Sequence, residues 1–582
     1  MSSSLREVDG LRVAVEGCGH GTLDAIYAAT QKACEGHGWD GVDLLIIGGD
    51  FQAVRNASDL TVMACPVKYR QIGDFHAYYS GAKKAPYLTI FVGGNHEASN
   101  HLWELFYGGW VAPNIWYMGA ANVVRLGGVR IAGMSGIWKG YNYNKPHFER
   151  LPYSADDIRS IYHVREIDTR KLLQLRSQVD IGISHDWPRE IEKYGDQRHL
   201  FRMKPDFEAE SRDGTLGNVA AKYVMDRLRP PLWFSAHLHC KFPAVKTYKK
   251  SAQEANNNLS QPTTTTAPVI EENGGSENTP TEVVAHNEDE IDLDMDDETP
   301  PPSEAPKNDV PISNELESGN GTSGTDGAAS STVASDLRAQ LFAAFSRPQR
   351  SDAAQQKLQP GQPTPPEITN MVVRFLSLDK CLPGRKFLQV LEVQPFNSGQ
   401  ESPSPKKSTS ARAAPKFEYD PEWLAITRSF NDAYKFERDS ETTPDQGEAQ
   451  YRIRIDEERQ WVEEHIVKPG KLEIPQNFVI TAPPYVVGSP EIVDEGPIEY
   501  NNPQTQQFCD LLGMKNPCYA TDEEKQQRME KGPPALNDRS HVPGGGRGGG
   551  GGRGGGRKFG GGRGHGRGGG GRGRGRGRGG RD

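Results

Sequence analysis

Short runs of apolar residues recur along residues 11–247 and predict β-strands. The runs at 44–47 (LLII) and 88–92 (LTIFV) are continuous and end at glycine, which is typical of buried central strands. The run at 11–15 (LRVAV) predicts a strand before them, and apolar residues at helical spacing over 23–34 predict a helix. Further strands are expected at 115–118, 122–126, 129–132, 180–184, 232–236 and 242–247, with a Gly-Gly hairpin turn between the second and the third of these.

Strands that first alternate with helical segments and then follow one another predict an α/β fold, a layered β-sandwich with flanking helices. Apolar residues return at 369–393 and predict two strands around a Leu-Pro-Gly-Arg turn, within a smaller C-terminal domain. Between these regions the chain is polar and acidic with few aromatic residues, so it cannot bury enough apolar surface to fold. We therefore expect a globular domain at 1–247, a disordered linker at 248–365, the C-terminal domain at 366–515, a second linker at 516–542 and a disordered tail at 543–582.

The formal net charge of -9 hides two segments of opposite sign. Residues 282–298 are dense in aspartate and glutamate, whereas residues 543–581 carry ten arginines and one lysine and no acidic residue. This tail is similar to the RGG boxes that bind RNA through phosphate charge and guanidinium stacking, with little sequence preference. The alternative is a flexible tail that only keeps the protein in solution.

Seven cysteines are spread along the chain without close pairs, which fits a reducing compartment better than a disulfide framework. No run approaches the roughly 20 apolar residues that a membrane-spanning helix needs. We expect a soluble, intracellular protein with no membrane contact.

Residues that can bind metal ions follow the predicted strands in five short motifs. Polar residues at the carboxyl ends of neighbouring strands gather at one edge of an α/β fold. Hydrolysis of a phosphodiester is served by two divalent ions about 3.5–4 Å apart, joined by a carboxylate, and Asp50 is the carboxylate placed to join them. The motifs are Gly-Cys-Gly-His (17–20), Gly-Gly-Asp (48–50), Gly-Asn-His-Glu (94–97), Ser-His-Asp (184–186) and His-Leu-His (237–239), and the other expected ligands are His20, Asn95, His185, His237 and His239.

The order of these motifs resembles the calcineurin-like metallophosphoesterase family, whose first motif is usually Asp-x-His. Here Cys18 stands where that family has the aspartate. The cysteine, together with later motifs, is similar to the lariat debranching enzymes of that family. The resemblance covers about 1–247 and, more loosely, 366–515, and its later motifs are SGIWKGYNY (135–143), YHVREIDTRKLLQL (162–175), SHDWP (184–188), FLSLDKCLPGRKFLQVLEV (375–393) and NPQTQQF (502–508).

The resemblance implies two divalent ions, Fe(II) and Zn(II) or Mn(II), with Cys18 among the ligands. A thiolate is a soft ligand that suits zinc or iron, so the ion at Cys18 would lose a hard ligand and be held less tightly. Alternatively, Cys18 is a small buried residue without a ligand role. The resemblance also implies that His96 is the general acid, or a positive charge, at the leaving oxygen, whereas the alternative is a hydrogen bond that holds its turn. Glu97 either orients His96 or caps a helix.

The resemblance further implies hydrolysis of the 2'-5' phosphodiester of lariat intron RNA in mRNA processing, and residence in the nucleus. The long polar and aromatic insertion at about 139–165 is then expected to recognise the branch, since stacking of a base on an aromatic ring contributes about 1–3 kcal/mol. The alternative is a solvated loop with a few packed tyrosines. The expected RNA-binding residues are Tyr141, Tyr143, His147, Tyr153, Arg159, Tyr162, His163 and Arg165.

Two other functions fit parts of the sequence. The five motifs alone would suit a metallophosphatase for phosphoproteins or nucleotides, but the insertion and the later motifs argue against it. The tail alone would suit a non-catalytic RNA-binding scaffold, which has no use for a full set of metal ligands. The sequence identifies no protein partner.

Overall fold

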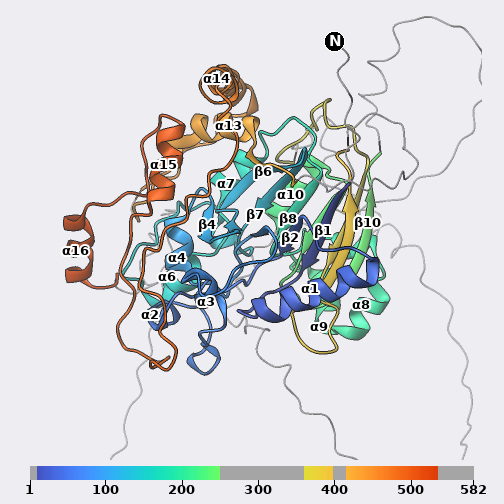
Figure 1. Cartoon of the computed structure of the whole chain (residues 1–582). Helices are drawn as coiled ribbons and strands as arrows, with labels where there is room; N and C mark the ends of the chain where they lie inside the picture. The colour runs from blue at the N-terminus through green and yellow to red at the C-terminus, as the bar shows by residue number, and fades with distance from the viewer. Residues whose placement is uncertain (1–9, 250–358, 397–413, 439, 535–582) are drawn as a thin grey trace, which may run out of the picture.

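The computed structural model describes residues 10–249, 359–396, 414–438 and 440–534 (Figure 1). The predicted tail and almost all of the predicted linker at 248–365 lie outside these residues. The strands are β1 (Leu11–Glu16), β2 (Leu44–Ile47), β3 (Thr89–Phe91), β4 (Gly109–Ala112), β5 (Ile115–Tyr117), β6 (Ala121–Leu126), β7 (Val129–Met134), β8 (Ile181–Ser184), β9 (Leu232–Ser235), β10 (Phe242–Thr247), β11 (Val372–Ser377), β12 (Leu388–Val393) and β13 (Phe417–Tyr419).

The strands form two sheets that share one core (Figure 1). One sheet has the order β12-β1-β2-β3-β5-β4, and the other has the order β10-β11-β9-β8-β7-β6-β13. Because side chains alternate along a strand, Val13 and Val15 of β1 enter the core shared with the second sheet, whereas Ala14 faces helix α1. The predicted layered α/β sandwich is confirmed.

Helices cover the two sheets on their outer sides. Helix α1 packs Leu23, Ile26 and Tyr27 on the first sheet, while α7 contacts β6 and α10 at the second. Among the described residues no helix combines the length and apolar character that a membrane crossing requires. The α-helices are α1 (Leu23–His37), α2 (Ala57–Leu60), α3 (Phe75–Tyr79), α4 (Ser99–Glu104), α5 (Gly140–Tyr143), α6 (Ala155–Ser160), α7 (Glu166–Leu172), α8 (Gln197–Met203), α9 (Asp206–Asp213), α10 (Val219–Leu228), α13 (Pro421–Phe430), α14 (Glu448–Val462), α15 (Pro503–Leu511) and α16 (Asp522–Lys531).

The strands predicted from apolar runs at 11–247 are present, and their ends differ from the predicted ones by at most two residues. The predicted hairpin is β6 and β7, which pair Leu126 with Val129 across Gly127 and Gly128. Both glycines have positive φ, 55° and 90°, which a two-residue hairpin turn of this kind requires. The short edge strands β4 and β13 and the helices α5 to α9 were not predicted.

The two strands predicted around the Leu-Pro-Gly-Arg turn do not pair with each other. Strand β12 joins the first sheet beside β1, and β11 joins the second between β9 and β10. The segment between them crosses from one sheet to the other next to Cys18, whose carbonyl accepts a hydrogen bond from the N–H of Cys381 (3.4 Å). The C-terminal region therefore completes both sheets of the first domain.

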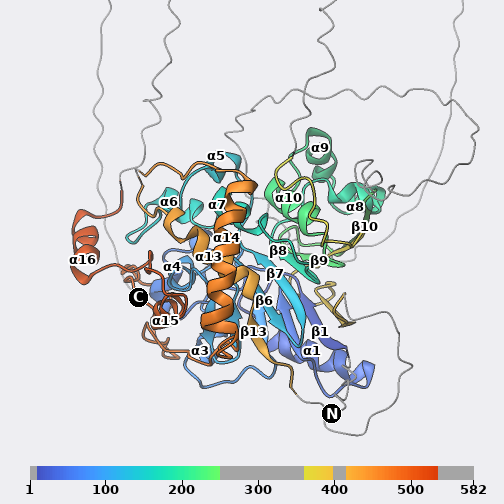
Figure 2. The ribbon, with the colours of Figure 1, turned by 90° about the horizontal axis from the view of Figure 1, so that it is seen from above.

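The remaining C-terminal elements wrap the edge of the sandwich, with α13 and α14 stacked across its top (Figures 1 and 2). Gln504 of α15 pairs with edge strand β4. The side-chain amide of Gln504 accepts a hydrogen bond from the backbone N–H of Trp110 (2.8 Å) and donates one to the backbone carbonyl of Trp110 (2.9 Å). The segment predicted as a linker at 516–542 contains helix α16, which begins at a capping box of Thr521 and Glu524.

Asp420 joins the C-terminal region to the β6–β7 hairpin. Its buried carboxylate accepts hydrogen bonds from Arg125 (2.7 Å) and from Arg130 (2.8 and 2.9 Å), and it caps α13 through the N–H of Trp423 (3.0 Å). Burial by itself would raise the pKa of Asp420, but the two guanidinium groups lower it to about 2.

Replacing Asp420 by alanine is expected to lower the free energy of unfolding by about 3–5 kcal/mol, since it removes one partner of a buried ion pair. In the wild type this contribution is present above the pKa of an unfolded aspartate, about 3.9, and is lost as the pH falls toward the folded value of about 2. Urea denaturation measures both effects. The exposed Asp432→Ala is the control and should change stability by less than about 0.5 kcal/mol; a similar small change for Asp420→Ala would contradict the prediction.

Candidate metal centre

The five motifs meet at one edge of the sandwich, where the parallel strands β1, β2, β3, β8 and β9 end. One group of ligand atoms comes from Cys18, His20, Asp50 and His239, and these atoms all lie within 4.8 Å of one another. Nε2 of His20 is 3.4 Å from Nε2 of His239 and 3.7 Å from Oδ2 of Asp50. The arrangement fits a single metal ion with sulfur, nitrogen and oxygen ligands.

Cys18 lies within this group and not among apolar side chains alone. Its side chain is fully buried, and Sγ accepts a hydrogen bond from the backbone N–H of His237 (3.2 Å). A hydrogen bond to sulfur favours the thiolate, which is the form that binds a metal. The position of Sγ therefore fits the ligand role that the resemblance implies.

A second group of ligand atoms lies on the other side of the Asp50 carboxylate. Nε2 of His185 is 3.4 Å from Oδ1 of Asp50 and 3.2 Å from Oδ1 of Asn95. The ring of His237 lies 4.9 Å from that of His185, centre to centre, and its Nδ1 is buried without a hydrogen-bond partner in the part of the chain that the structure describes. A buried imidazole nitrogen in this position fits a second metal ion. Asp50 thus presents one oxygen to each group.

The backbone is strained where these ligands sit. Non-glycine residues with positive φ are uncommon, and such strain persists only where the surrounding structure imposes it, often at functional sites. Four expected ligands and one neighbour adopt positive φ: His20 (42°), Asp50 (46°), Gln52 (62°), His237 (60°) and His239 (47°).

Two glycines let the loops approach one another. A Cβ on Gly94 would overlap Oδ1 of Asp50, and a Cβ on Gly49 would overlap the His185 ring. The Asn95 loop can therefore reach Asp50 only because these positions lack side chains.

Hydrogen bonds of two buried side chains, His185 and Glu97, hold the second group in place. Nδ1–H of His185 donates to the carbonyl of Gly48 (2.9 Å), so that Nε2 keeps its lone pair for a metal. Burial lowers the pKa of His185 and favours this neutral form. Glu97 accepts the backbone N–H groups of Phe51, Gln52 and Gly94 (2.8, 2.8 and 3.0 Å), and it ties the Asp50 loop to the Asn95 loop. Burial raises the pKa of Glu97 to about 8, against the effect of these three donors.

His96 lies beside the first group. Its backbone N–H donates to Oδ1 of Asp50 (2.8 Å), and its ring centre is 5.6 Å from that of His20. The backbone N–H of His96 therefore holds the turn, and this hydrogen bond does not involve the imidazole ring.

Gln52 is a site residue that the sequence did not reveal. Its Nε2 lies 3.2 Å from Nδ1 of His20. A metal at Nε2 of His20 requires the proton on Nδ1, and a half-turn of the Gln52 amide brings its oxygen there as the acceptor. Only its place two residues after Asp50 marks Gln52 in the sequence.

The insertion lies against the metal site. The N–H of Trp138 at its start donates to the carboxylate of Asp186 (3.2 Å), which follows His185. A cavity between the insertion and the Asn95 loop is lined by both, including Gly94, Glu97 and Tyr162. The insertion contains the short helices α5 and α6 and is not the open loop that its composition suggested.

Four of the residues expected to bind RNA are buried and have partners inside the protein. Arg165 pairs with Glu149 (2.5 Å), His147 with Asp168 (2.6 Å) and His163 with Asn142 (2.8 Å). Tyr153 packs with Val62 and Leu151 in a small apolar cluster. Arg165 and Tyr153 therefore shape the insertion, whereas His147 and His163 also line the cavity beside the Asn95 loop.

The other four expected residues are accessible to different degrees. Tyr141 is 68% exposed and lies edge-on to the His163 ring at 5.9 Å. Arg159 is exposed on α6, whereas Tyr143 and Tyr162 are half-buried. Tyr143 lies 4.8 Å from Trp138, ring centre to ring centre. Among these residues, Tyr141 therefore offers the most accessible aromatic surface.

Comparison with known proteins agrees with this geometry. The calcineurin-like phosphoesterase family model matches residues 11–241, and the model of the lariat debranching enzyme C-terminal domain matches residues 370–517. A lariat debranching enzyme of Schizosaccharomyces pombe is 38% identical over 506 residues, which are 87% of this chain and 96% of that protein. The lariat debranching enzymes of Homo sapiens and Arabidopsis thaliana are 37% and 35% identical, with 87% of this chain matched to 69% and 86% of theirs. These matches show that the chain belongs to the lariat debranching enzyme family.

Proposed function

We propose that this protein hydrolyses the 2'-5' phosphodiester at the branch of lariat RNA at a two-metal site, and so linearises excised introns. The observation that carries the proposal is the Asp50 carboxylate, whose two oxygens face two separate groups of ligands. The family matches support debranching and favour neither a phosphatase nor a scaffold that only binds RNA.

One ion would be held by Cys18, His20, His239 and Asp50, and the other by Asn95, His185, His237 and Asp50. Bound here, two divalent ions would activate water at neutral pH and neutralise charge on the attacking and leaving oxygens. The donor set supports Fe(II) or Zn(II) at Cys18, since thiolate is soft, and Zn(II) or Mn(II) at the other position.

His96 would protonate the adenosine 2'-oxygen as it leaves. Its ring stands at the edge of the first group of ligands, and its backbone bond to Asp50 fixes the turn that presents it. Histidine is the side chain that most often transfers a proton to or from a reacting group. The Asp50 contact does not depend on the ring, so the two functions of His96 are separable by mutation.

The accessible part of the insertion would bind the splayed nucleotides of the branch. Tyr141 offers a ring for stacking, and Arg159 offers charge to phosphate. Tyr143 and Tyr162 line the approach with less exposed surface.

The Arg-Gly tail would hold RNA without sequence preference, and the substrate implies residence in the nucleus. Ten arginines over 543–581 support the first point. Fluorescence microscopy of the tagged full-length chain tests the second, and exclusion from the nucleus would contradict it.

Incubation of the protein with branched RNA, linear RNA and a phosphopeptide, with Fe(II), Zn(II) or Mn(II) added, tests the reaction. We expect only the branched RNA to be cleaved. His96→Ala should lower kcat by about 10²–10⁴, which is the usual contribution of an acid or base, with an unchanged metal content. His199→Ala, a change at an exposed histidine of α8, is the control. Turnover of the phosphopeptide without cleavage of the branch would overturn the proposal.

Gln52→Leu is expected to weaken metal binding about 10-fold to 100-fold, because it removes the group that orients a ligand histidine. Gln52→Glu should keep the affinity, since its carboxylate accepts the Nδ1–H bond of His20. Both substitutions meet the same strained φ of 62°, so the comparison isolates the hydrogen bond. Titration calorimetry with Mn(II) measures the effect, and equal affinities for the two variants would argue against this role of Gln52.

Removal of residues 543–582 is expected to weaken binding of single-stranded RNA. The slope of log affinity against log salt should become shallower by about 0.7 for each phosphate that the tail no longer neutralises. The kcat for branched RNA should not change. A tail of the same length with its arginines replaced by glutamine is the control for length. Unchanged affinity at low salt in both variants would show that the tail does not bind RNA.

A further inference from the structure

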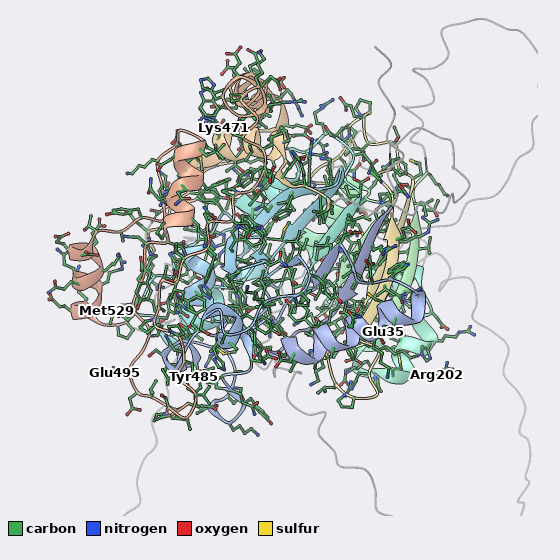
Figure 3. All side chains as sticks on the ribbon, in the orientation of Figure 1. Glu35, Arg202, Lys471, Tyr485, Glu495 and Met529 are labelled. Carbon is green, nitrogen blue, oxygen red and sulfur yellow. The ribbon has the colours of Figure 1, made fainter. Side chains whose placement is uncertain are left out.

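A segment of the C-terminal region without regular structure, residues 477–485, lies against the loops that carry Asp50 and Asn95. We call it the strap. Phe478 packs edge-on to Tyr79 of α3 (5.6 Å), and Tyr485 packs with the apolar cluster around α2. Tyr485 lies at the lower face of the molecule in Figure 3. The strap is distant in sequence from both loops, and its role is not explained by the chemistry at the ligands.

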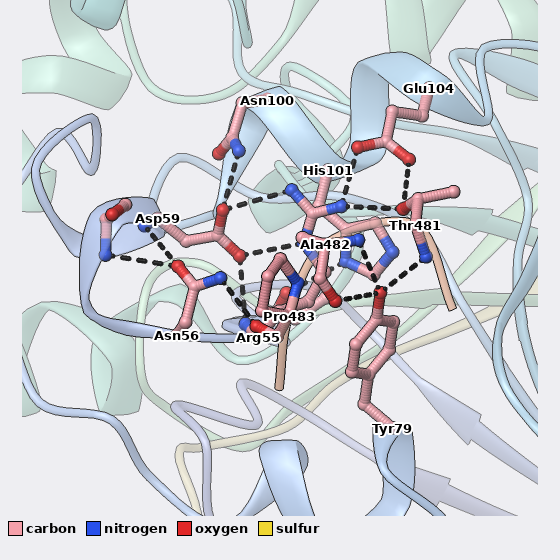
Figure 4. A network of polar contacts seen from close by, with 12 residues as sticks. Arg55, Asn56, Asp59, Tyr79, Asn100, His101, Glu104, Thr481, Ala482 and Pro483 are labelled. Atoms are coloured by element: carbon pink, nitrogen blue, oxygen red, sulfur yellow. Dashed lines mark hydrogen bonds and ion pairs between the residues drawn. The ribbon is translucent and has the colours of Figure 1, made fainter. Parts of the chain in front are cut away.

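Beneath the strap, the chain that follows Asp50 is bonded to the chain that follows Asn95 (Figure 4). This second connection lies beyond the one made by Glu97. It consists of three hydrogen bonds, which are Arg55 Nη1 to Glu104 Oε1 (2.6 Å), Asn100 Nδ2 to Asp59 Oδ1 (2.6 Å) and His101 Nδ1 to the carbonyl of Ala53 (2.9 Å).

Thr481 of the strap closes this connection. Its hydroxyl donates to Oε2 of Glu104 (2.7 Å) and accepts from Nη1 of Arg55 (2.9 Å), so one side chain contacts both loops. Figure 4 shows Thr481 between Glu104 and the Arg55 guanidinium.

Backbone groups hold the strap in this position. The N–H of Tyr485 donates to the carbonyl of Arg55 (2.7 Å), and Asn56 donates to the carbonyl of Pro483 (2.8 Å). The hydroxyl of Tyr79 accepts the N–H groups of Thr481 and Ala482 (2.8 and 2.9 Å).

The charges in this network leave little freedom. Arg55, Asp59 and Glu104 are buried, with side chains at most 1% exposed. Burial alone would raise the pKa of Asp59, but the neighbouring Arg55 lowers it, so the ion pair persists. Each hydrogen bond in such a network gives a buried polar atom a partner. When one bond is lost, the unpaired atom costs free energy, and the neighbouring side chains and loops shift to lower that cost.

We propose that the strap is a positioning element of the metal site, in which Thr481 fixes the Asp50 loop and the Asn95 loop relative to each other through Arg55 and Glu104. The second group of ligands needs this, because Oδ1 of Asp50 and Oδ1 of Asn95 come from different loops and must both lie beside Nε2 of His185, 3.4 and 3.2 Å away, to share one ion with it. The inference deepens the proposed function and rests on it only for its kinetic readout.

The test compares Thr481→Val with Thr481→Ser in the full chain. Valine keeps the shape and removes the hydroxyl, whereas serine restores the hydroxyl. For Thr481→Val we expect about a 10-fold loss of Mn(II) affinity by titration calorimetry, the lower end of the effect of removing a group that supports a metal ligand. The kcat for branched RNA should fall by a similar factor with little change in KM, and Thr481→Ser should recover both.

Asn477→Ala is the matched control, since Asn477 lies on the same strap and bonds the side chain of Gln507 away from the network (2.7 Å). Tyr79→Phe is a second probe, because it loosens the strap without touching Arg55 or Glu104, and it carries the test if Thr481→Val does not fold. Wild-type Mn(II) affinity in Thr481→Val or Tyr79→Phe would overturn the inference, even with a lowered melting temperature. A wild-type protein that binds Mn(II) but leaves branched RNA intact would overturn the proposed function, while the comparison of affinities would still decide on the strap.

Discussion

The sharing of the Asp50 carboxylate between two groups of ligands is the constraint on which the rest of the structure depends. The carboxylate is fully buried, and its two oxygens point to histidines from different strands. Burying an anion is costly unless positive charge or hydrogen bonds compensate it. Bound cations would provide that compensation, and the fold must then deliver their other ligands to the same place.

Two sheets, rather than one, make this delivery possible. Strands β1, β2 and β3 bring Cys18, Asp50 and Asn95 to the site, and strands β8 and β9 bring His185 and His237 from the facing sheet. Parallel neighbours end side by side, so their loops converge without long excursions. The strained φ values at His20, Asp50, His237 and His239 are tolerated because a packed strand or helix fixes each end of these loops.

Apolar periodicity and the five motifs predicted the strands, the layered fold and the residues that meet at Asp50, because each of these is encoded locally. The prediction was weaker where partners are distant in sequence. The resemblance implied that Arg165 and His147 bind RNA, and it did not reveal that they pair with Glu149 and Asp168 inside the protein. Strand β11 pairs with β9 and β10, and β12 pairs with β1. These pairings join segments that are distant in sequence, so the local pattern of apolar residues does not predict them. The proposed role of Gln52 depends on one hydrogen bond and that of Thr481 on two, and residue spacing does not predict such bonds.

The C-terminal region reaches the metal site by more than one route, which argues against regarding it as an appended domain. Strand β12 pairs with β1 along its whole length and supports the loop of Cys18, and the crossing segment after β11 bonds the Cys18 carbonyl directly. The strap bonds the loops of Asp50 and Asn95 from the opposite side. Loops that carry strained ligands need support from several directions, since a single tether leaves a hinge. The supporting unit is therefore the sandwich together with the C-terminal segments that complete it.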